Sequence, residues 1–210
     1  MPVVGSGATD PVASEELAPI ARHIAREAAR LFAARGYDAT SVREIVEAAG
    51  VTKPTMYYYF GSKEGLAEAL VTAPLDGLCD RMRSILDREG EPRRMLARLI
   101  EANFEFVRQD PDRGRFIYGL FFGPLGSGLA SELARFAERI EALWDEAMGR
   151  FVAAGLIDRS RVRGAVAALR GLVIVHTIEF LYRGTELGPG LPARLVADLL
   201  EGFARREAHR

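Results

Sequence analysis

Residues Ser41 to Lys63, SVREIVEAAGVTKPTMYYYFGSK, decide the fold of this 210-residue chain. The stretch predicts two short helices joined by a tight turn. Ser41 and Glu44 have the three-residue spacing of a capping box, in which each side chain accepts a hydrogen bond from the other residue's free backbone N–H. Apolar residues then recur at helical spacing up to Gly50. We expect the first helix to end at this glycine, because the turn needs a residue that tolerates positive φ.

The second helix, about residues 53–60, is polar and aromatic on its outer face. Thr52 precedes it as an N-cap, and Pro54 fits in the first turn, where a missing N–H costs nothing. Met56 and Phe60 supply most of the helix's apolar surface, and its other side chains donate hydrogen bonds or stack. Two helices around a glycine-containing turn, the second of them polar outward, are typical of a helix-turn-helix that reads DNA.

The same stretch resembles the DNA-binding domain of the tetracycline-repressor (TetR) family of bacterial regulators. The resemblance covers about residues 20–70, where RLFAARGYDATSVREIVEAAGV-KPT-YYYFGSKEGL is close to the family pattern along its whole length. The rest of the chain resembles the family only in length and helical character. The resemblance implies that a double-stranded DNA operator is bound by Ser41, Arg43, Thr52, Lys53, Pro54, Thr55, Tyr57, Tyr58, Tyr59 and Lys63.

Some of these residues have individual expectations. Arg43 matches a family position that often reaches a base edge, and arginine is the usual bidentate partner of guanine; a solvated arginine is the alternative. Successive helical residues are about 100° apart, so we expect one tyrosine to pack inward and two to face DNA. By family position, Tyr58 resembles a phosphate contact, Tyr59 a base or sugar contact, and Tyr57 a residue between phosphate contact and domain packing. Lys63 matches a phosphate-binding lysine.

Composition and charge bound the class of protein. A chain of this length forms one or two domains, and 49% hydrophobic residues supply a sizeable core. The net charge of −1 excludes a polyelectrolyte binder, but residues 22–63 hold seven basic residues against four acidic ones, which suits a phosphate backbone. A single cysteine, Cys79, excludes an internal disulfide and favours a reducing cytoplasm. We expect no apolar run of membrane-spanning length and no signal peptide, and therefore a cytoplasmic protein without a membrane partner.

Periodicity elsewhere predicts an all-α chain of about nine helices, because no stretch shows sustained alternation with a period of two. Outside the two reading helices, the expected helices are residues 19–35, 63–89, 92–108, 112–122, 129–154, 159–183 and 192–206. Pro74 interrupts the second of these and predicts a kink or break at residues 72–77. We expect a disordered arm in residues 1–13, a helix-turn-helix DNA-binding domain in 14–70, and a larger helical ligand-binding and dimerisation bundle in 71–210.

The last two expected helices, residues 159–183 and 192–206, carry more apolar surface than one buried stripe needs. Gly164, Ala168 and Gly171 form a strip of small residues that lets another helix approach closely. Either the first of these helices is central in its own monomer, or it packs on a partner. The resemblance implies the second arrangement, a homodimer formed through both helices as a four-helix bundle, whose two copies meet successive major grooves.

Large apolar residues fill the middle of the chain, and such residues are more often plain core than the lining of a cavity. A ligand site needs a few polar groups in that lining. The candidates for binding a small-molecule effector are Asn103, Phe104, Phe116, Tyr118, Phe121, Phe122, Trp144, Met148, His176, Glu179 and Phe180. His176 and Glu179 are one helical turn apart, and a hydrogen-bonded core pair is the simpler interpretation.

No catalytic constellation stands out. There is no Cys/His cluster with metal-ligand spacing, no nucleophile–base arrangement and no phosphate-binding loop, so we expect no metal, no cofactor and no enzyme activity. The sequence therefore predicts a ligand-responsive DNA-binding transcriptional regulator, in this family most often a repressor that a small, mostly apolar molecule releases from a palindromic operator. A small-molecule-sequestering helical protein with a vestigial DNA-binding domain is the alternative.

Overall fold

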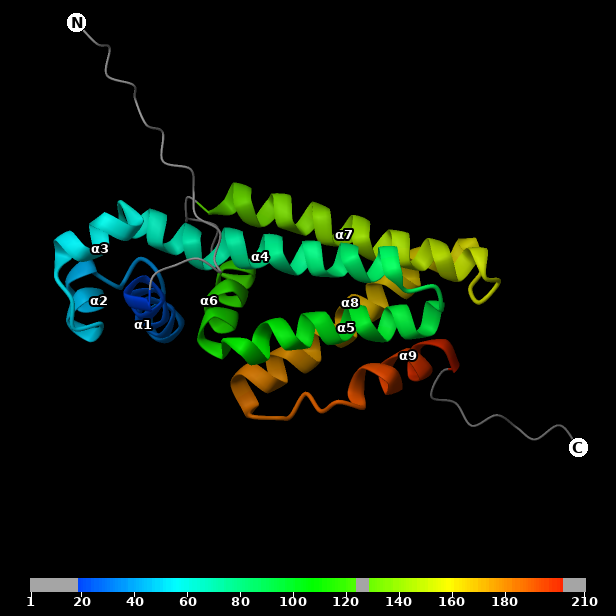
Figure 1. The fold of residues 1–210 in the computed structure, drawn as a ribbon. Coiled ribbons are helices and arrows are strands. Elements are labelled where there is room, and N and C mark those ends of the chain that lie inside the picture. The colour runs from blue at the N-terminus through cyan, green and yellow to red at the C-terminus, as the bar shows by residue number, and fades with distance from the viewer. Residues whose placement is uncertain (1–18, 124–128, 202–210) are drawn as a thin grey trace, which may run out of the picture. The chain divides into compact units, whose positions relative to one another are not determined.

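The computed structural model describes residues 19–123 and 129–201, and all regular structure in these ranges is helical. The helices are α1 (Pro19–Arg35), α2 (Val42–Ala48), α3 (Lys53–Phe60), α4 (Lys63–Arg88), α5 (Pro92–Gln109), α6 (Pro111–Phe122), α7 (Ala130–Ala153), the 3₁₀ turn η1 (Arg159–Arg161), α8 (Val162–Arg183) and α9 (Leu191–Glu201) (Figure 1). The predicted all-α class is confirmed. The expected disordered arm, and residues 202–206 of the last expected helix, lie outside the described residues.

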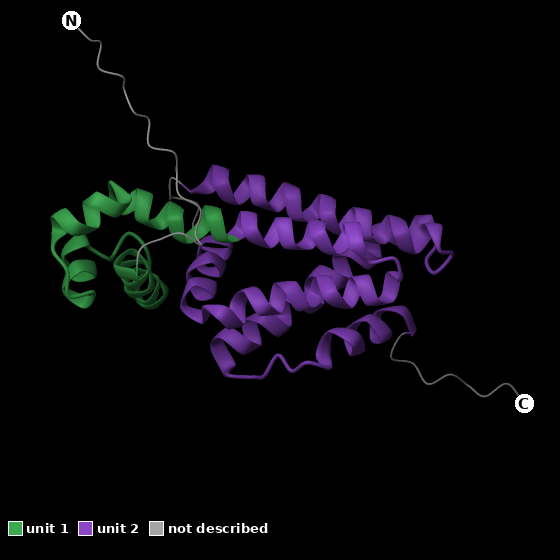
Figure 2. Ribbon diagram, viewed as in Figure 1, with its two compact units in different colours: residues 1–74 green, residues 75–210 purple. Residues whose placement is uncertain are grey.

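The chain divides into two compact units, residues 1–74 and residues 75–210 (Figure 2). In the first unit, α1, α2, α3 and the start of α4 enclose a small core. The fully buried side chains of Ile24, Ile45, Met56 and Leu66 supply one apolar contact from each of these four helices. Since α3 has only eight residues, it is too short to be stable alone and depends on these contacts.

The local signals in the first unit act as the sequence predicts. Ser41 Oγ accepts from the backbone N–H of Glu44 at 3.3 Å, and Glu44 Oε2 accepts from the backbone N–H of Ser41 at 2.8 Å, so the capping box forms. Gly50 has a φ of +61°, the conformation that the turn requires. Thr52 Oγ1 caps α3 by accepting from the N–H of Thr55 at 3.4 Å.

Of the kink or break expected at residues 72–77, the break does not occur, because α4 is one unbroken helix with Pro74 inside it. A proline in a helix interior costs about 3 kcal/mol. Apolar side chains on both sides of Pro74 offset that cost: Leu70, Leu75 and Leu78 are each at most 6% exposed, and burying one leucine contributes about 1.5–3 kcal/mol. Tertiary burial therefore overrides the local signal.

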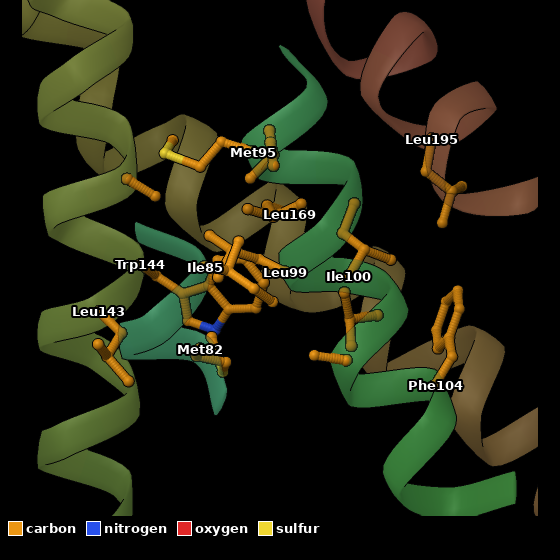
Figure 3. Close-up of a cluster of buried hydrophobic side chains, with 14 of the residues drawn as sticks. Met82, Ile85, Met95, Leu99, Ile100, Phe104, Leu143, Trp144, Leu169 and Leu195 are labelled. Carbon is orange, nitrogen blue, oxygen red and sulfur yellow. The ribbon is translucent and has the colours of Figure 1, made fainter. Parts of the chain in front are cut away.

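The second unit is a helical bundle with α5 at its centre, in contact with α6, α7, α8 and α9. Figure 3 shows Trp144 of α7 turned toward the side chains of α4 and α5 in the core. The surface adds ion pairs between α4 and α7, which join Arg83 to Glu146 and Arg139 to Asp76. The bundle is thus closed by apolar burial inside and by arginine–carboxylate pairs at its rim.

Residues 159–183 correct one further expectation. By length and composition this segment could cross a membrane. Its most apolar stretch has a mean hydropathy of 1.6, so the expectation that the chain holds no apolar run of membrane-spanning length is wrong. One helix of this kind is weak evidence for a membrane protein. Only 28% of that stretch is buried within the chain, and Val175 and Tyr182 are 55% and 57% exposed. Much of the apolar surface of α8 therefore remains uncovered in a single copy.

Candidate nucleic-acid interface and effector site

The outer face of α3 consists of exposed tyrosines. Tyr58 is 83% exposed and Tyr57 44%, while Tyr59 is half-buried with its ring against Tyr58 at a centroid distance of 5.0 Å. Two of the three tyrosines are exposed and the third, Tyr59, is partly turned inward, so the expectation of one inward and two outward rings is met in part. Met56 is the fully buried residue of the helix, at 0% exposure. The phenol rings are therefore available to a partner outside the chain.

The N-terminus of α3 adds hydrogen-bond donors beside these rings. Thr52, Lys53 and Pro54 are exposed, and Thr55 is half-buried. The hydroxyls of Thr52 and Thr55 lie 2.8 Å apart. Free backbone N–H groups and the positive end of the helix dipole attract an anion at such a terminus. Phosphate oxygens are ligands that fit this arrangement.

The exposed surface of α2 carries arginine–carboxylate pairs. Arg43 Nε donates to Glu47 Oε1 at 2.7 Å, and the hydrogen bond to Glu47 raises the pKa of Arg43 above its usual value. Arg35 Nη1 donates to Glu44 Oε1, also at 2.7 Å. Both pairs face solvent, so each arginine can exchange its carboxylate for a base edge or a phosphate at little cost. The hydroxyl of Ser41 is engaged by Glu44 Oε2 at 2.8 Å.

The start of α4 holds the remaining predicted DNA contact. Ser62 Oγ accepts from the N–H of Gly65 at 3.0 Å, as expected of an N-cap. Lys63 follows directly, and its ammonium nitrogen lies over the ring of Tyr37 at 4.2 Å from the centroid. Tyr37 was not among the predicted site residues, because the contact joins two segments that no sequence spacing relates.

The residues predicted to bind an effector fall into several environments. Phe104, Phe116, Trp144 and Met148 are at most 3% exposed, and Phe104 and Trp144 are labelled in the core of Figure 3. Asn103 is half-buried and donates to the carbonyl of Leu99 at 2.9 Å. Others lie at the edge of the bundle: Tyr118, Phe121, His176 and Phe180 are half-buried. The side chain of Phe122 is 66% exposed and does not line the interior.

The expected hydrogen bond between His176 and Glu179 does not form. Glu179 instead pairs with Arg183 at 3.4 Å, and the His176 ring meets Phe104 edge-on at 6.4 Å between centroids. Both residues are half-buried at the surface of the bundle, where the carboxylate of Glu179 can contact water and an arginine. The arginine one turn further along the helix is the better partner for a carboxylate than a neutral imidazole is.

Thr177 is a buried polar residue that the sequence analysis passed over. It is 1% exposed, and its hydroxyl makes no hydrogen bond of good geometry to the described residues. Burial raises the pKa of the nearby Tyr118 phenol, and an interaction with Thr177 opposes that rise without satisfying the threonine hydroxyl. The feature of the sequence that could have indicated this residue is a single threonine in an apolar stretch of helix.

A surface groove of about 880 Å³ lies between α7 and the start of α8. Its lining carries charges of both signs and includes none of the residues predicted to bind an effector: Glu141, Asp145, Gly149, Val152, Arg159, Ser160, Val162, Arg163, Val166, Ala167 and Arg170. Among residues 19–123 and 129–201, no group of three or more His, Cys, Asp or Glu side chains is placed to hold a metal ion.

The first comparison with known proteins concerns the helices of residues 1–74. The family model of the bacterial regulatory proteins of the tetR family matches residues 24–70. The HTH-type transcriptional repressor KstR2 of Mycobacterium tuberculosis is 40% identical over 80 residues, which are 38% of this chain and 40% of that protein. The chain thus matches less than half the length of KstR2.

Two further similarities extend over most of the chain. The HTH-type transcriptional regulator YdgC of Bacillus subtilis is 29% identical over 192 residues, covering 87% of this chain and 91% of YdgC. The solved structure of the transcriptional regulator FadR from Bacillus subtilis in complex with stearoyl-CoA aligns with a TM-score of 0.69 at 19% identity, covering 87% of this chain and 99% of FadR. At that identity the structural similarity establishes the fold.

Proposed function

We propose that this chain, which belongs to the tetR family of bacterial regulatory proteins, is a homodimeric transcriptional regulator that binds DNA and responds to a small-molecule effector. The observation that carries the proposal is the exposed face of α3. A short helix whose outer surface is three tyrosines, two of them exposed and one half-buried, gains little for its own fold from that surface. It is suited instead to contact a partner that offers phosphates and base edges.

In this proposal α3 lies in the major groove with its N-terminal residues at base edges. Arg43 reads a base from α2, and Tyr58 and Lys63 contact the phosphate backbone. Phosphate contacts fix the orientation of the protein on the duplex, and base contacts supply the sequence preference. The predicted DNA-binding residues therefore fall into two classes, base contacts and phosphate contacts, and mutations in the two classes have different effects on DNA binding.

The exposed apolar surface of α8 supports a homodimer formed through α8 and α9. Gly164, Ala168 and Gly171 are exposed and recur at helical spacing, and the larger Val175 and Tyr182 continue this face. Such a strip lets a second helix approach closely, and burying it removes apolar area from water. A two-fold dimer presents two copies of α3, so the operator is an inverted repeat with half-sites about 34–36 Å apart or a multiple of that distance.

The effector in this proposal is a small, mostly apolar molecule that binds residues 75–210. FadR of Bacillus subtilis, a protein of the same fold, was solved with stearoyl-CoA, and KstR2 is named a repressor. Both facts support a repressor that loses its operator when an apolar ligand binds. The ligand acts only through its different affinities for the DNA-binding and the released state. Such a protein works in the cytoplasm, where its operator is.

Selection from a random-sequence DNA pool at moderate salt tests the proposal. The full chain is expected to enrich an inverted repeat whose half-sites follow the spacing of a two-fold dimer. Failure to enrich any repeat would contradict a regulator and favour the sequestration of a small molecule. Retention of an apolar compound by the purified chain, seen by native mass spectrometry, distinguishes these outcomes from a protein that binds neither.

A further inference from the structure

Tyr37 lies where the chain turns from α1 to α2, and its ring is packed between two helices. On one side it meets Phe32 of α1 at 5.3 Å between ring centroids, and Phe32 is itself 2% exposed. On the other side the ring carries the ammonium of Lys63 at 4.2 Å from the centroid. That distance is well within the range of an attractive cation–π contact. Lys63 is therefore held against a ring that the core of the first unit keeps in place.

The hydroxyl end of Tyr37 lies near the carboxylate of Glu64. Burial, followed by the charge of Glu64, raises the pKa of Tyr37 to about 12. The phenol therefore stays protonated at neutral pH. The Tyr37 ring is held in place by its contact with Phe32.

The ring contact leaves the N–H donors of Lys63 available. The pKa of the adjacent Glu64 is lowered chiefly by its own backbone N–H and the Ser62 side chain, and the charge of Lys63 is a smaller cause. A ring face attracts the ammonium without accepting its N–H groups as a carboxylate oxygen does. Lysine otherwise has a flexible four-carbon stem with many rotamers. The ring limits these rotamers while the N–H donors remain available.

We propose that Tyr37 is a positioning residue for Lys63, which it holds at the start of α4 with its ammonium ready for a DNA phosphate. The inference rests on the proposed DNA-binding function and goes beyond it, because it assigns to Tyr37 a role that acts through Lys63. It makes one structural claim, that the ring orients the lysine in the free protein, and one functional claim, that this orientation contributes to the phosphate contact.

Lysine-selective isotope labelling tests the structural claim in the full chain without DNA. The chain has two lysines, Lys53 and Lys63, and Lys53 on α3 is exposed, so it serves as an internal reference. Ring currents should shift the Lys63 side-chain methylene protons upfield of those of Lys53. The shift should persist in Tyr37→Phe and disappear in Tyr37→Leu, which keeps an apolar contact to Phe32. Two lysines with the same methylene shifts in the wild-type chain would overturn the inference.

The functional claim is tested by the salt dependence of binding to a fluorescein-labelled duplex that the wild-type chain enriches from a random pool. Lys63→Gln should flatten the slope of log K against log salt by about 0.9 per subunit, the value of one phosphate contact. Tyr37→Leu should weaken binding about two- to ten-fold per subunit, because the Lys63 side chain must then be immobilised on binding DNA instead of beforehand. It should have no further effect in the Lys63→Gln background, as expected of residues that act together.

The outcomes separate the inference from the proposed function. If the wild-type chain binds the duplex but Tyr37→Leu weakens it equally with and without Lys63, the positioning role is wrong and the regulator stands. If the wild-type chain binds no duplex, the proposed function and this inference fail together.

Discussion

Arg43 and Glu47 form an ion pair one turn apart on α2, with 2.7 Å between Arg43 Nε and Glu47 Oε1. The two side chains are 77% and 59% exposed, so the pair lies in solvent and contributes little to the stability of the fold. If Arg43 reads a base as proposed, its guanidinium must leave Glu47 before it can make two hydrogen bonds to a guanine. In the proposed complex Glu47 therefore competes with the operator for Arg43.

The first prediction concerns this competition. Arg43→Ala should relax the preference for one base pair per half-site, by about 1–3 kcal/mol of discrimination. Glu47→Gln is the matched variant, and it should strengthen binding without relaxing that preference, because it frees Arg43. Binding to operator duplexes with each base substituted in turn measures both effects. An equal loss of affinity on every duplex would show that Arg43 is a phosphate contact only.

The second prediction concerns Tyr58. Because its side chain is 83% exposed, Tyr58→Ala should leave the midpoint of thermal unfolding unchanged and weaken binding to all sequences alike. Lys63→Ala should likewise weaken binding to all sequences alike, and it should also reduce the salt slope by about one per contact. A change in sequence preference in Tyr58→Ala would place this residue at a base instead.

The third prediction concerns the capping box of α2. Ser41→Ala should lower the free energy of unfolding by about 1 kcal/mol, the usual effect of removing an N-cap. The pKa of Glu44 lies below its ordinary value, first because the Ser41 backbone N–H bonds to the carboxylate. The stability from Glu44 is thus present above the unfolded-state pKa and is lost as the pH falls through the folded-state pKa. Acid unfolding of Glu44→Gln should lack this component, and identical pH profiles would contradict the assignment.

Local signals in the sequence were sufficient for the elements that a few neighbouring residues determine. Ser41, Thr52 and Ser62 cap their helices as expected, since a cap depends on residues within one turn. The break predicted at Pro74 does not form because the burial of Leu70 and Leu75 is a tertiary property. Packing on both sides of Pro74 keeps α4 unbroken, and the local sequence pattern carries no information about that packing.

The effector residues illustrate a different limit. Aromatic composition is the same for a packed core and for the lining of a cavity, so it did not distinguish the buried Phe104 from the exposed Phe122. The contact of Lys63 with Tyr37 could likewise not be predicted from the sequence, because it depends on how the turn after α1 packs against the start of α4. The effector residues therefore stay a prediction.

The fourth prediction concerns Pro74. Pro74→Ala should supply the missing backbone N–H to α4 and raise the free energy of unfolding by up to about 3 kcal/mol. Amide hydrogen exchange in the surrounding turns of α4 should slow. Pro92→Ala is the matched control, because a proline in the first turn of α5 interrupts no helical hydrogen bond. Equal effects of the two substitutions would show that Pro74 does not weaken α4.

The fifth prediction concerns the exposed strip on α8. Val175→Asp should place a charge in the proposed dimer interface, where burying it without a partner is costly, and sedimentation velocity should show a shift from dimer to monomer. Ala134→Asp, at an exposed position on α7, should leave the dimer intact. A wild-type chain that sediments as a monomer would contradict the homodimer directly.

Methylation interference on the selected operator tests most directly whether the tyrosine-bearing face of α3 enters the major groove. Guanine N7 lies in that groove, so methylating it within each half-site should block binding of the full chain, whereas a small minor-groove ligand should leave the complex intact. The opposite result, binding that tolerates N7 methylation and is displaced by the minor-groove ligand, would contradict the assignment of α3 as the element that reads the DNA.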